Sequence, residues 1–130
     1  GDTIEVGLAD INDTLRTRYL LNRWYVLKAH KYLAERLRDM LNRYKELSFE
    51  PSGLTIRQLK SRWGSCSSKG KITLNSELIK LDPVLIDYVI VHELCHLKHH
   101  NHGYDFHKLL GELIPEYKSL RKELRKYLTR

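Results

Sequence analysis

The first third of the chain carries apolar residues at helical spacing. From Thr14 to Leu47 they recur every three or four positions, with arginine and lysine residues between them, which is the pattern of an amphipathic helix. The pattern predicts either one long helix or two helices joined near His30. Residues 1–13 carry only weak signals, and the segment from Phe49 to Gly53, which contains a proline, is predicted to end the helical region.

Two short strands are predicted next. Residues Thr55–Trp63 alternate enough between apolar and polar side chains to indicate a strand, and Lys71–Asn75 indicates a second one. The small residues at positions 64–70 predict a loop between them. We expect Lys71–Asn75 to form an exposed edge strand.

A strongly apolar helix is predicted from Pro83 to about His100. Asp82 is expected to accept a hydrogen bond from the first-turn amides, and Pro83 suits the first helical position. Asn101 and Gly103, which tolerate positive φ, are expected to end this helix. The residues that it should bury are Leu85, Ile86, Tyr88, Val89, Ile90 and Val91.

The last part of the chain predicts two more helices, Tyr104–Leu113 and one that begins at Pro115. Four or five helices around a small sheet make an α+β domain. The 130 residues are 42% hydrophobic and 30% charged, an ordinary composition for a folded domain, so we expect a single domain over residues 1–130. Because the chain begins with Gly1 rather than Met, an upstream segment is expected to be missing.

Charge and cysteine content indicate which cellular compartment and which classes of binding partner to expect. No apolar run approaches the roughly 20 residues of a membrane helix, so no membrane partner is expected. With only Cys66 and Cys95, the sequence predicts no disulfide framework and a reducing, cytoplasmic location. A net charge of +7 suits acidic partners. Basic residues crowd the last helix, and they are Lys118, Arg121, Lys122, Arg125, Lys126 and Arg130.

This basic helix is interpreted first as a solvated face. Nucleic-acid binding is only weakly supported, because no basic groove interleaved with aromatic residues accompanies the charges. The oligomeric state is not fixed by the sequence, and a monomer is favoured.

Candidate chemistry is concentrated in the apolar helix, which contains the sequence His92-Glu93-Leu94-Cys95-His96. Histidines at i and i+4 project from the same face of a helix, so both imidazoles can reach one metal ion. Glu93 is turned about 100° away from His92, which lets its carboxylate approach a metal-bound water without becoming a ligand. Zinc is the expected ion, because imidazole donors suit it.

A catalytic zinc needs a third protein ligand and an open position for water. We favour His102, which follows His96 by six residues, the spacing of the third ligand in HExxHxxGxxH enzymes, although His99 stands where those have glycine. His107 on the next helix is one alternative. A carboxylate, Glu112 or Glu116, is the other.

Three segments together resemble the YgjP-like metallopeptidase family. They are Arg62-Trp63-Gly64-Ser65-Cys66-Ser67, Gly70-Lys71-Ile72-Thr73-Leu74-Asn75, and Val89-Ile90-Val91-His92-Glu93-Leu94-Cys95-His96-Leu97. His102-Gly103 followed by Phe106 is also similar to the His-Gly-x-x-Phe element of SprT-like proteases such as Spartan. A tryptophan commonly follows that phenylalanine, and here His107 takes its place.

The resemblance implies a zincin-like metallopeptidase domain. It implies zinc on His92, His96 and His102, Glu93 as the catalytic base that activates the zinc-bound water, and a peptide or protein as substrate. The expected edge strand adds a hypothesis about substrate binding, with contacts from Thr73, Leu74 and Asn75. The alternative from another class is a non-enzymatic DNA- or protein-binding module whose metal site is structural or vestigial.

Overall fold

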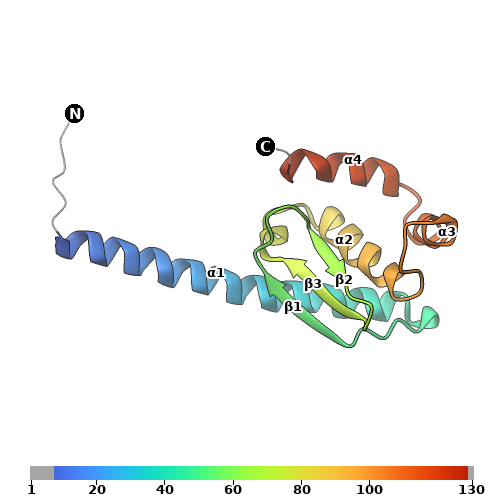
Figure 1. The fold of residues 1–130 in the computed structure, drawn as a ribbon, viewed down its shortest axis with the longest axis horizontal. Coiled ribbons are helices and arrows are strands. Elements are labelled where there is room, and N and C mark those ends of the chain that lie inside the picture. Colours follow the sequence, from blue (N-terminus) through green and yellow to red (C-terminus); the bar gives the residue numbers. More distant parts are fainter. Residues whose placement is uncertain (1–7, 129–130) are drawn as a thin grey trace.

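The computed structural model describes residues 8–128. Figure 1 shows a long first helix whose N-terminal part projects from the body that the other elements form. Within the described residues the elements are, in chain order, α1 (Leu8–Arg43), the 3-10 helix η1 (Lys45–Leu47), β1 (Gly53–Arg57), β2 (Gly64–Cys66), β3 (Lys71–Asn75), the 3-10 helix η2 (Ser76–Lys80), α2 (Pro83–His96), α3 (Tyr104–Leu113) and α4 (Tyr117–Leu128).

Helix α1 is a single helix of 36 residues, so the break considered near His30 does not occur. It begins at Leu8, earlier than the weak signals of residues 1–13 predict, while residues 1–7 lie outside the described part. Only its C-terminal half contributes to the core, through residues such as Leu33 and Met40. The N-terminal half projects away from the body (Figure 1). Six large apolar side chains on it are more than half exposed: Leu15, Tyr19, Leu20, Leu21, Trp24 and Leu27.

A paired ion bridge fastens α1 to α2. The Arg36 guanidinium donates through Nε to Asp87 Oδ1 at 2.9 Å and through Nη2 to Asp87 Oδ2 at 2.7 Å. Both side chains are half-buried. Two parallel charge-assisted bonds fix orientation as well as distance, so this contact sets how α2 lies along α1.

The sheet has the strand order β1-β3-β2, with β1 parallel and β2 antiparallel to β3. The prediction that Lys71–Asn75 is an edge strand is therefore wrong, because β3 is the central strand. The predicted strand Thr55–Trp63 is shorter, since β1 ends at Arg57. Part of the predicted loop is the edge strand β2, which exists through its pairing with β3.

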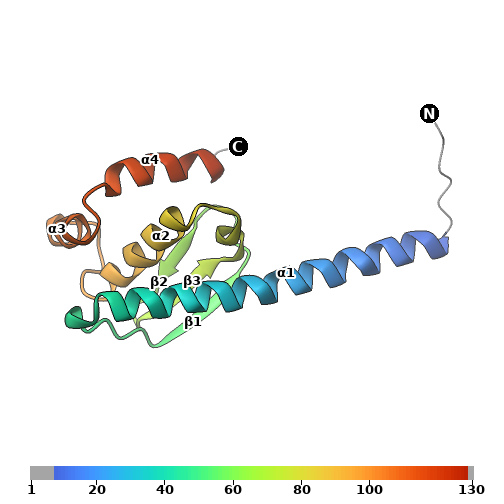
Figure 2. The same ribbon diagram turned by 180° about the vertical axis from the view of Figure 1, so that it is seen from behind.

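Helices α1 and α2 cover one face of this sheet, as the two opposite views show (Figures 1 and 2). Helix α2 buries all six apolar residues predicted for it. Asp82 occupies the N-cap position and Pro83 begins the helix, but the Asp82 side chain makes no capping hydrogen bond, which corrects that expectation. Helix α4 crosses over α2 and anchors itself through the buried Leu124.

Helix α2 ends at His96 rather than near His100. Gly103 is extended and forms the N-cap of α3. Neither Asn101 nor Gly103 has the positive φ expected of it; over residues 8–128 that conformation occurs at Ser48 and Gly70. The turn instead uses the Asn101 side chain, whose Oδ1 accepts a hydrogen bond from the Gly103 amide at 3.3 Å. The sharp reversal over residues 97–103 folds the chain back toward the last turns of α2.

Candidate metal centre and cleft

Three histidine side chains converge at the C-terminal end of α2. His92 and His96 lie one helical turn apart on α2, and His102 approaches them from the turn that follows. Each offers a ring nitrogen, and these three nitrogens lie within 4.8 Å of one another. His96 is buried, His92 is half-buried and His102 is exposed. The three imidazoles therefore form a group that is able to hold a metal ion and is open on one side.

The spacing and the donor atoms fit zinc. The Nε2 atoms of His96 and His102 are 3.0 Å apart, and two ligands of a tetrahedral zinc at roughly 2.0–2.1 Å are about 3.3 Å from each other. Burial lowers the pKa of His102, and the neighbouring imidazoles of His96 and His92 lower it further. A neutral imidazole keeps the lone pair that a metal needs.

Contacts behind the imidazoles fix their orientation. His96 Nδ1 lies 3.0 Å from the His99 carbonyl oxygen, and donation to that oxygen leaves Nε2 as the acceptor nitrogen. The ring of Phe106, on α3 and 1% exposed, packs against all three imidazoles. It stacks on His96 with ring centroids 4.4 Å apart and meets His92 and His102 edge-on at 5.0 Å and 4.9 Å.

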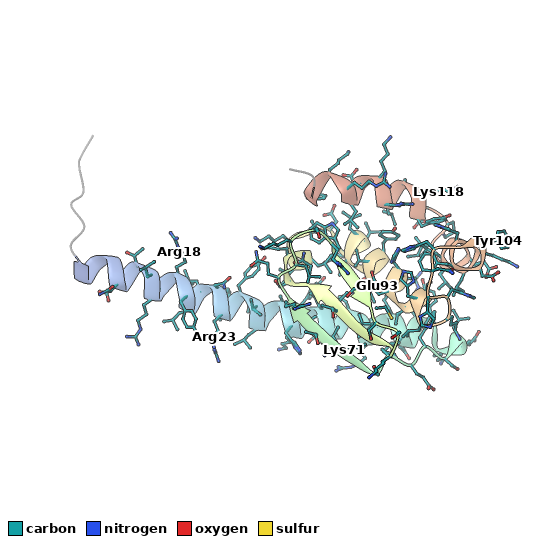
Figure 3. All side chains as sticks on the ribbon, viewed as in Figure 1. Arg18, Arg23, Lys71, Glu93, Tyr104 and Lys118 are labelled. Carbon is teal, nitrogen blue, oxygen red and sulfur yellow. The ribbon has the colours of Figure 1, made fainter. Side chains whose placement is uncertain are left out.

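Glu93 lies beside the histidines within the body of the domain, far from the projecting half of α1 that carries Arg18 and Arg23 (Figure 3). It is 5% exposed, and its Oε2 is 3.3 Å from His92 Nδ1. Gly64, the first residue of β2, packs directly against it, because a Cβ at this position would stand 3.2 Å from Glu93 Cγ and Oε2. The glycine therefore makes room for the carboxylate between α2 and the sheet.

The alternative third ligands lie outside the histidine group. His107 on α3 points toward Tyr117, with ring centroids 5.8 Å apart, and its buried Nδ1 has no hydrogen-bond partner among residues 8–128. Glu112 and Glu116 are exposed. Over the described residues, none of the three belongs to the group formed by the other histidines.

The residues expected to bind substrate do not line the site through their side chains. Leu74 and Asn75 are fully buried, and Thr73 is half-buried on the central strand. The Asn75 amide donates to the Leu59 and Arg62 carbonyl oxygens at 3.0 Å each, and its Oδ1 accepts from the Glu77 amide. Asn75 thus holds the loop before β2 in place, and the edge-strand reasoning behind these three residues fails.

Sequence reasoning did not assign Tyr88, Arg121 and Arg125 to a cavity next to Glu93. This cavity of about 420 Å³ lies between β2, α2 and α4. Its lining includes His92, Glu93, Tyr88, Trp63, Arg121 and Arg125. The only signal in the sequence was the spacing of the two arginines at i and i+4 in α4, which places them on one face.

The two cysteines are free thiols whose pKa values are raised. Cys95 is fully buried inside the histidine helix, and burial raises its pKa to about 12. Burial also raises the pKa of Cys66 on β2, with a smaller contribution from the charge of Glu93. Neither forms a disulfide. The prediction that Cys95 is a buried filler is confirmed.

Comparison with known protein families identifies the family of this chain. The family model described as YgjP-like, metallopeptidase domain, matches residues 1–127. The chain belongs to the YgjP-like metallopeptidase family. The resemblance inferred from the sequence is thereby confirmed, and peptide or protein hydrolysis is the activity of the class. No curated protein matches the chain.

Two solved structures share the fold of this YgjP-like chain. The metallopeptidase zymogen abylysin of Pyrococcus abyssi has 28% sequence identity and a TM-score of 0.62, and the match covers 72% of this chain and 96% of that one. The metallopeptidase zymogen jannalysin of Methanocaldococcus jannaschii has 25% identity and a TM-score of 0.62, covering 75% and 97%. The predicted α+β, zincin-like fold is confirmed. No helix within residues 8–128 has the length and apolar character to cross a membrane.

Proposed function

We propose that this chain is a zinc-dependent peptidase in which His92, His96 and His102 hold the metal and Glu93 is the catalytic base. The observation that carries the proposal is the convergence of three imidazoles with a buried carboxylate beside them. Zinc bound at such a site would act as a Lewis acid, which lowers the pKa of a water towards about 7 and polarises a carbonyl oxygen. The family supports the hydrolase class, and the donor set supports zinc.

Glu93 is suited to move a proton at the reaction centre. Its Oε2 lies 3.3 Å from His92 Nδ1, so the carboxylate borders the imidazole group while remaining outside the set of three metal-binding side chains. We infer that Glu93 takes a proton from the attacking water and later delivers it to the departing amine. The close contact with Gly64 keeps the Glu93 carboxylate next to His92.

The peptide substrate is proposed to bind along β2 instead of β3. Among the described strands, β2 pairs only with β3, so its other edge has backbone groups that an extended peptide can use. The first residue of β2 is Gly64, which touches Glu93. A peptide added to this edge would therefore pass close to the proposed base.

A binding module with a structural metal is supported less well. Structural zinc sites usually have four protein ligands, whereas the histidine group among residues 8–128 has three members. A three-ligand site with an open side matches the catalytic type. The basic face of α4 is the feature that favoured nucleic acid, and Arg130 of that set lies outside the described residues.

The test is a comparison of Glu93→Gln with the wild-type chain. We expect cleavage of a fluorogenic peptide to fall by about 10²–10⁴-fold, the usual contribution of general acid–base catalysis. Zinc bound per chain, measured by atomic emission, should stay unchanged. Glu112→Gln is the matched control, because Glu112 is exposed and outside the histidine group, and it should keep full activity. Undiminished cleavage by Glu93→Gln would remove this residue from the mechanism.

A further inference from the structure

A cavity lies next to Glu93, between β2, α2 and α4. It has a volume of about 420 Å³, large enough for an amino-acid side chain, and it is bordered by His92 and Glu93 at one end. Trp63, Val89 and Leu124 give it apolar walls. A group that enters this space therefore lies directly beside the residues proposed to carry out the chemistry.

Two arginines of α4 close the other side of the cavity. Arg121 and Arg125 are one helical turn apart and both line it. Leu124, between them in sequence, is buried and fixes this face of the helix against the body. Tyr88 lines the same cavity; burial raises the pKa of its hydroxyl, and the charges of Arg121 and Arg125 act against that rise.

We propose that this cavity binds a carboxylate of the peptide through Arg121 and Arg125, so that the enzyme prefers acidic substrates. The proposal rests on the peptidase function proposed above and names its substrate class. The carboxylate belongs either to a Glu or Asp side chain next to the cleaved bond or to the C-terminus of the peptide.

The charge distribution in the cavity favours an anion over the other classes of side chain. Glu93 is the one acidic residue among the described residues that line it, and it sits at the histidine end. A lysine or arginine of the substrate would meet three guanidinium groups of the same sign, since Arg62 also lines the cavity. A carboxylate would accept charge-assisted hydrogen bonds from them, and guanidinium groups match the planar carboxylate in geometry.

The experiment measures binding separately from cleavage. The chain has two tryptophans, so a Trp24→Phe, Glu93→Gln protein loaded with zinc reports on Trp63 in the cavity wall by its fluorescence. The probes are acetylated, amidated alanine heptapeptides with one Glu or one Gln, and an unblocked alanine heptapeptide with a free C-terminus. We expect the Glu peptide to bind about tenfold more tightly than the Gln peptide, in line with hydrogen bonds to a charged group.

Three double variants test where the preference originates. Arg121→Gln with Arg125→Gln leaves Arg62 as the one arginine of the lining and should bring the Glu-to-Gln ratio most of the way toward one. Lys122→Gln with Lys126→Gln is the matched control, because it removes the same charge from the same helix at residues that do not line the cavity, and it should leave the ratio unchanged. Arg121→Glu with Arg125→Glu should instead favour a Lys peptide, which gives a signal that misfolding cannot produce.

The outcomes separate the two proposals. Tighter binding of the internal Glu peptide identifies a side-chain carboxylate, and tighter binding of the unblocked peptide identifies the C-terminus. Equal affinity for Glu, Gln and unblocked peptides would overturn the carboxylate site, and so would an equal loss in the Arg121→Gln, Arg125→Gln variant and the Lys122→Gln, Lys126→Gln control. Absence of any cleavage by the zinc-loaded wild type would overturn the peptidase function alone, because the affinity ratio does not depend on turnover.

Discussion

A methyl group added at Gly64 would press on the side chain of Glu93. The Cβ of an alanine there would stand 3.2 Å from Glu93 Cγ and Oε2, and equally close to the Thr73 carbonyl oxygen, whereas ordinary contacts begin at 3.4 Å. The Thr73 oxygen belongs to the central strand and yields little. We therefore expect Gly64→Ala to displace the Glu93 carboxylate by a few tenths of an ångström.

The kinetic cost follows from that displacement. A misplacement of about 1 Å in a catalytic constellation can cost about 10²-fold in rate, so a shift of a few tenths should lower kcat by about 3- to 10-fold. KM should change little, because the cavity walls other than Gly64 are intact. Thermal stability should stay close to that of the wild type, since the tight contact opposes the gain of about 0.4–1 kcal/mol that Gly→Ala brings by restricting the unfolded chain.

Steady-state cleavage of a fluorogenic peptide, with zinc content measured on the same samples, checks this prediction. Gly53→Ala is the matched control, because its Cβ would meet only Lys71 Cγ, at 3.9 Å. It should behave like the wild type. Equal kcat for Gly64→Ala and Gly53→Ala would show that the placement of the Glu93 carboxylate does not limit the reaction.

Two further predictions concern stability and metal affinity. Asp87→Asn weakens the paired bridge to Arg36 and should lower the free energy of unfolding by about 1–2 kcal/mol. Asp39→Asn, the control at an exposed i,i+3 bridge to the same arginine, should lower it by less than about 0.5 kcal/mol. Equal losses of the two variants in urea unfolding would contradict this prediction. Phe106→Leu removes the ring that packs on the three imidazoles and should weaken zinc binding by about 10-fold or more, measured by chelator competition. Phe49→Leu is the control, because it makes the same change at the other phenylalanine, and it should leave zinc affinity unchanged.

The parts of the fold that depend on local pattern were predictable. Helix α2 follows from its apolar residues, and the site follows from a spacing that the helix itself imposes on His92 and His96. His102 was expected from its distance along the chain, and the structure brings it to the other two. Its role as a ligand stays a prediction.

The parts that depend on pairing across the chain were not predictable. Strand β2 has only three residues, Gly64–Cys66, with no alternation to reveal it, and it is a strand because β3 lies beside it. That pairing moves β3 from the edge to the centre and buries Asn75. The buried amide is stable there because it bonds two backbone carbonyls of a loop that the sequence pattern assigned to a strand.

In helix α1 the sequence pattern predicts the helix but not which part of it is buried. Its periodicity predicts an apolar face along the whole length, and the helix is indeed continuous. Periodicity does not say which turns meet a partner. Leu33 and Met40 are buried, whereas Leu15 and Tyr19 on the projecting half are more than half exposed.

The zinc affinity of His102→Ala is the sharpest check on the proposed metal site. The wild-type chain should bind one zinc per molecule, and loss of one of three imidazoles should weaken binding by at least about 100-fold, because each ligand contributes several kcal/mol. His107→Ala, which removes a histidine outside the group, should bind zinc like the wild type. Unchanged affinity in His102→Ala, or a loss in His107→Ala instead, would contradict the site of three converging histidines.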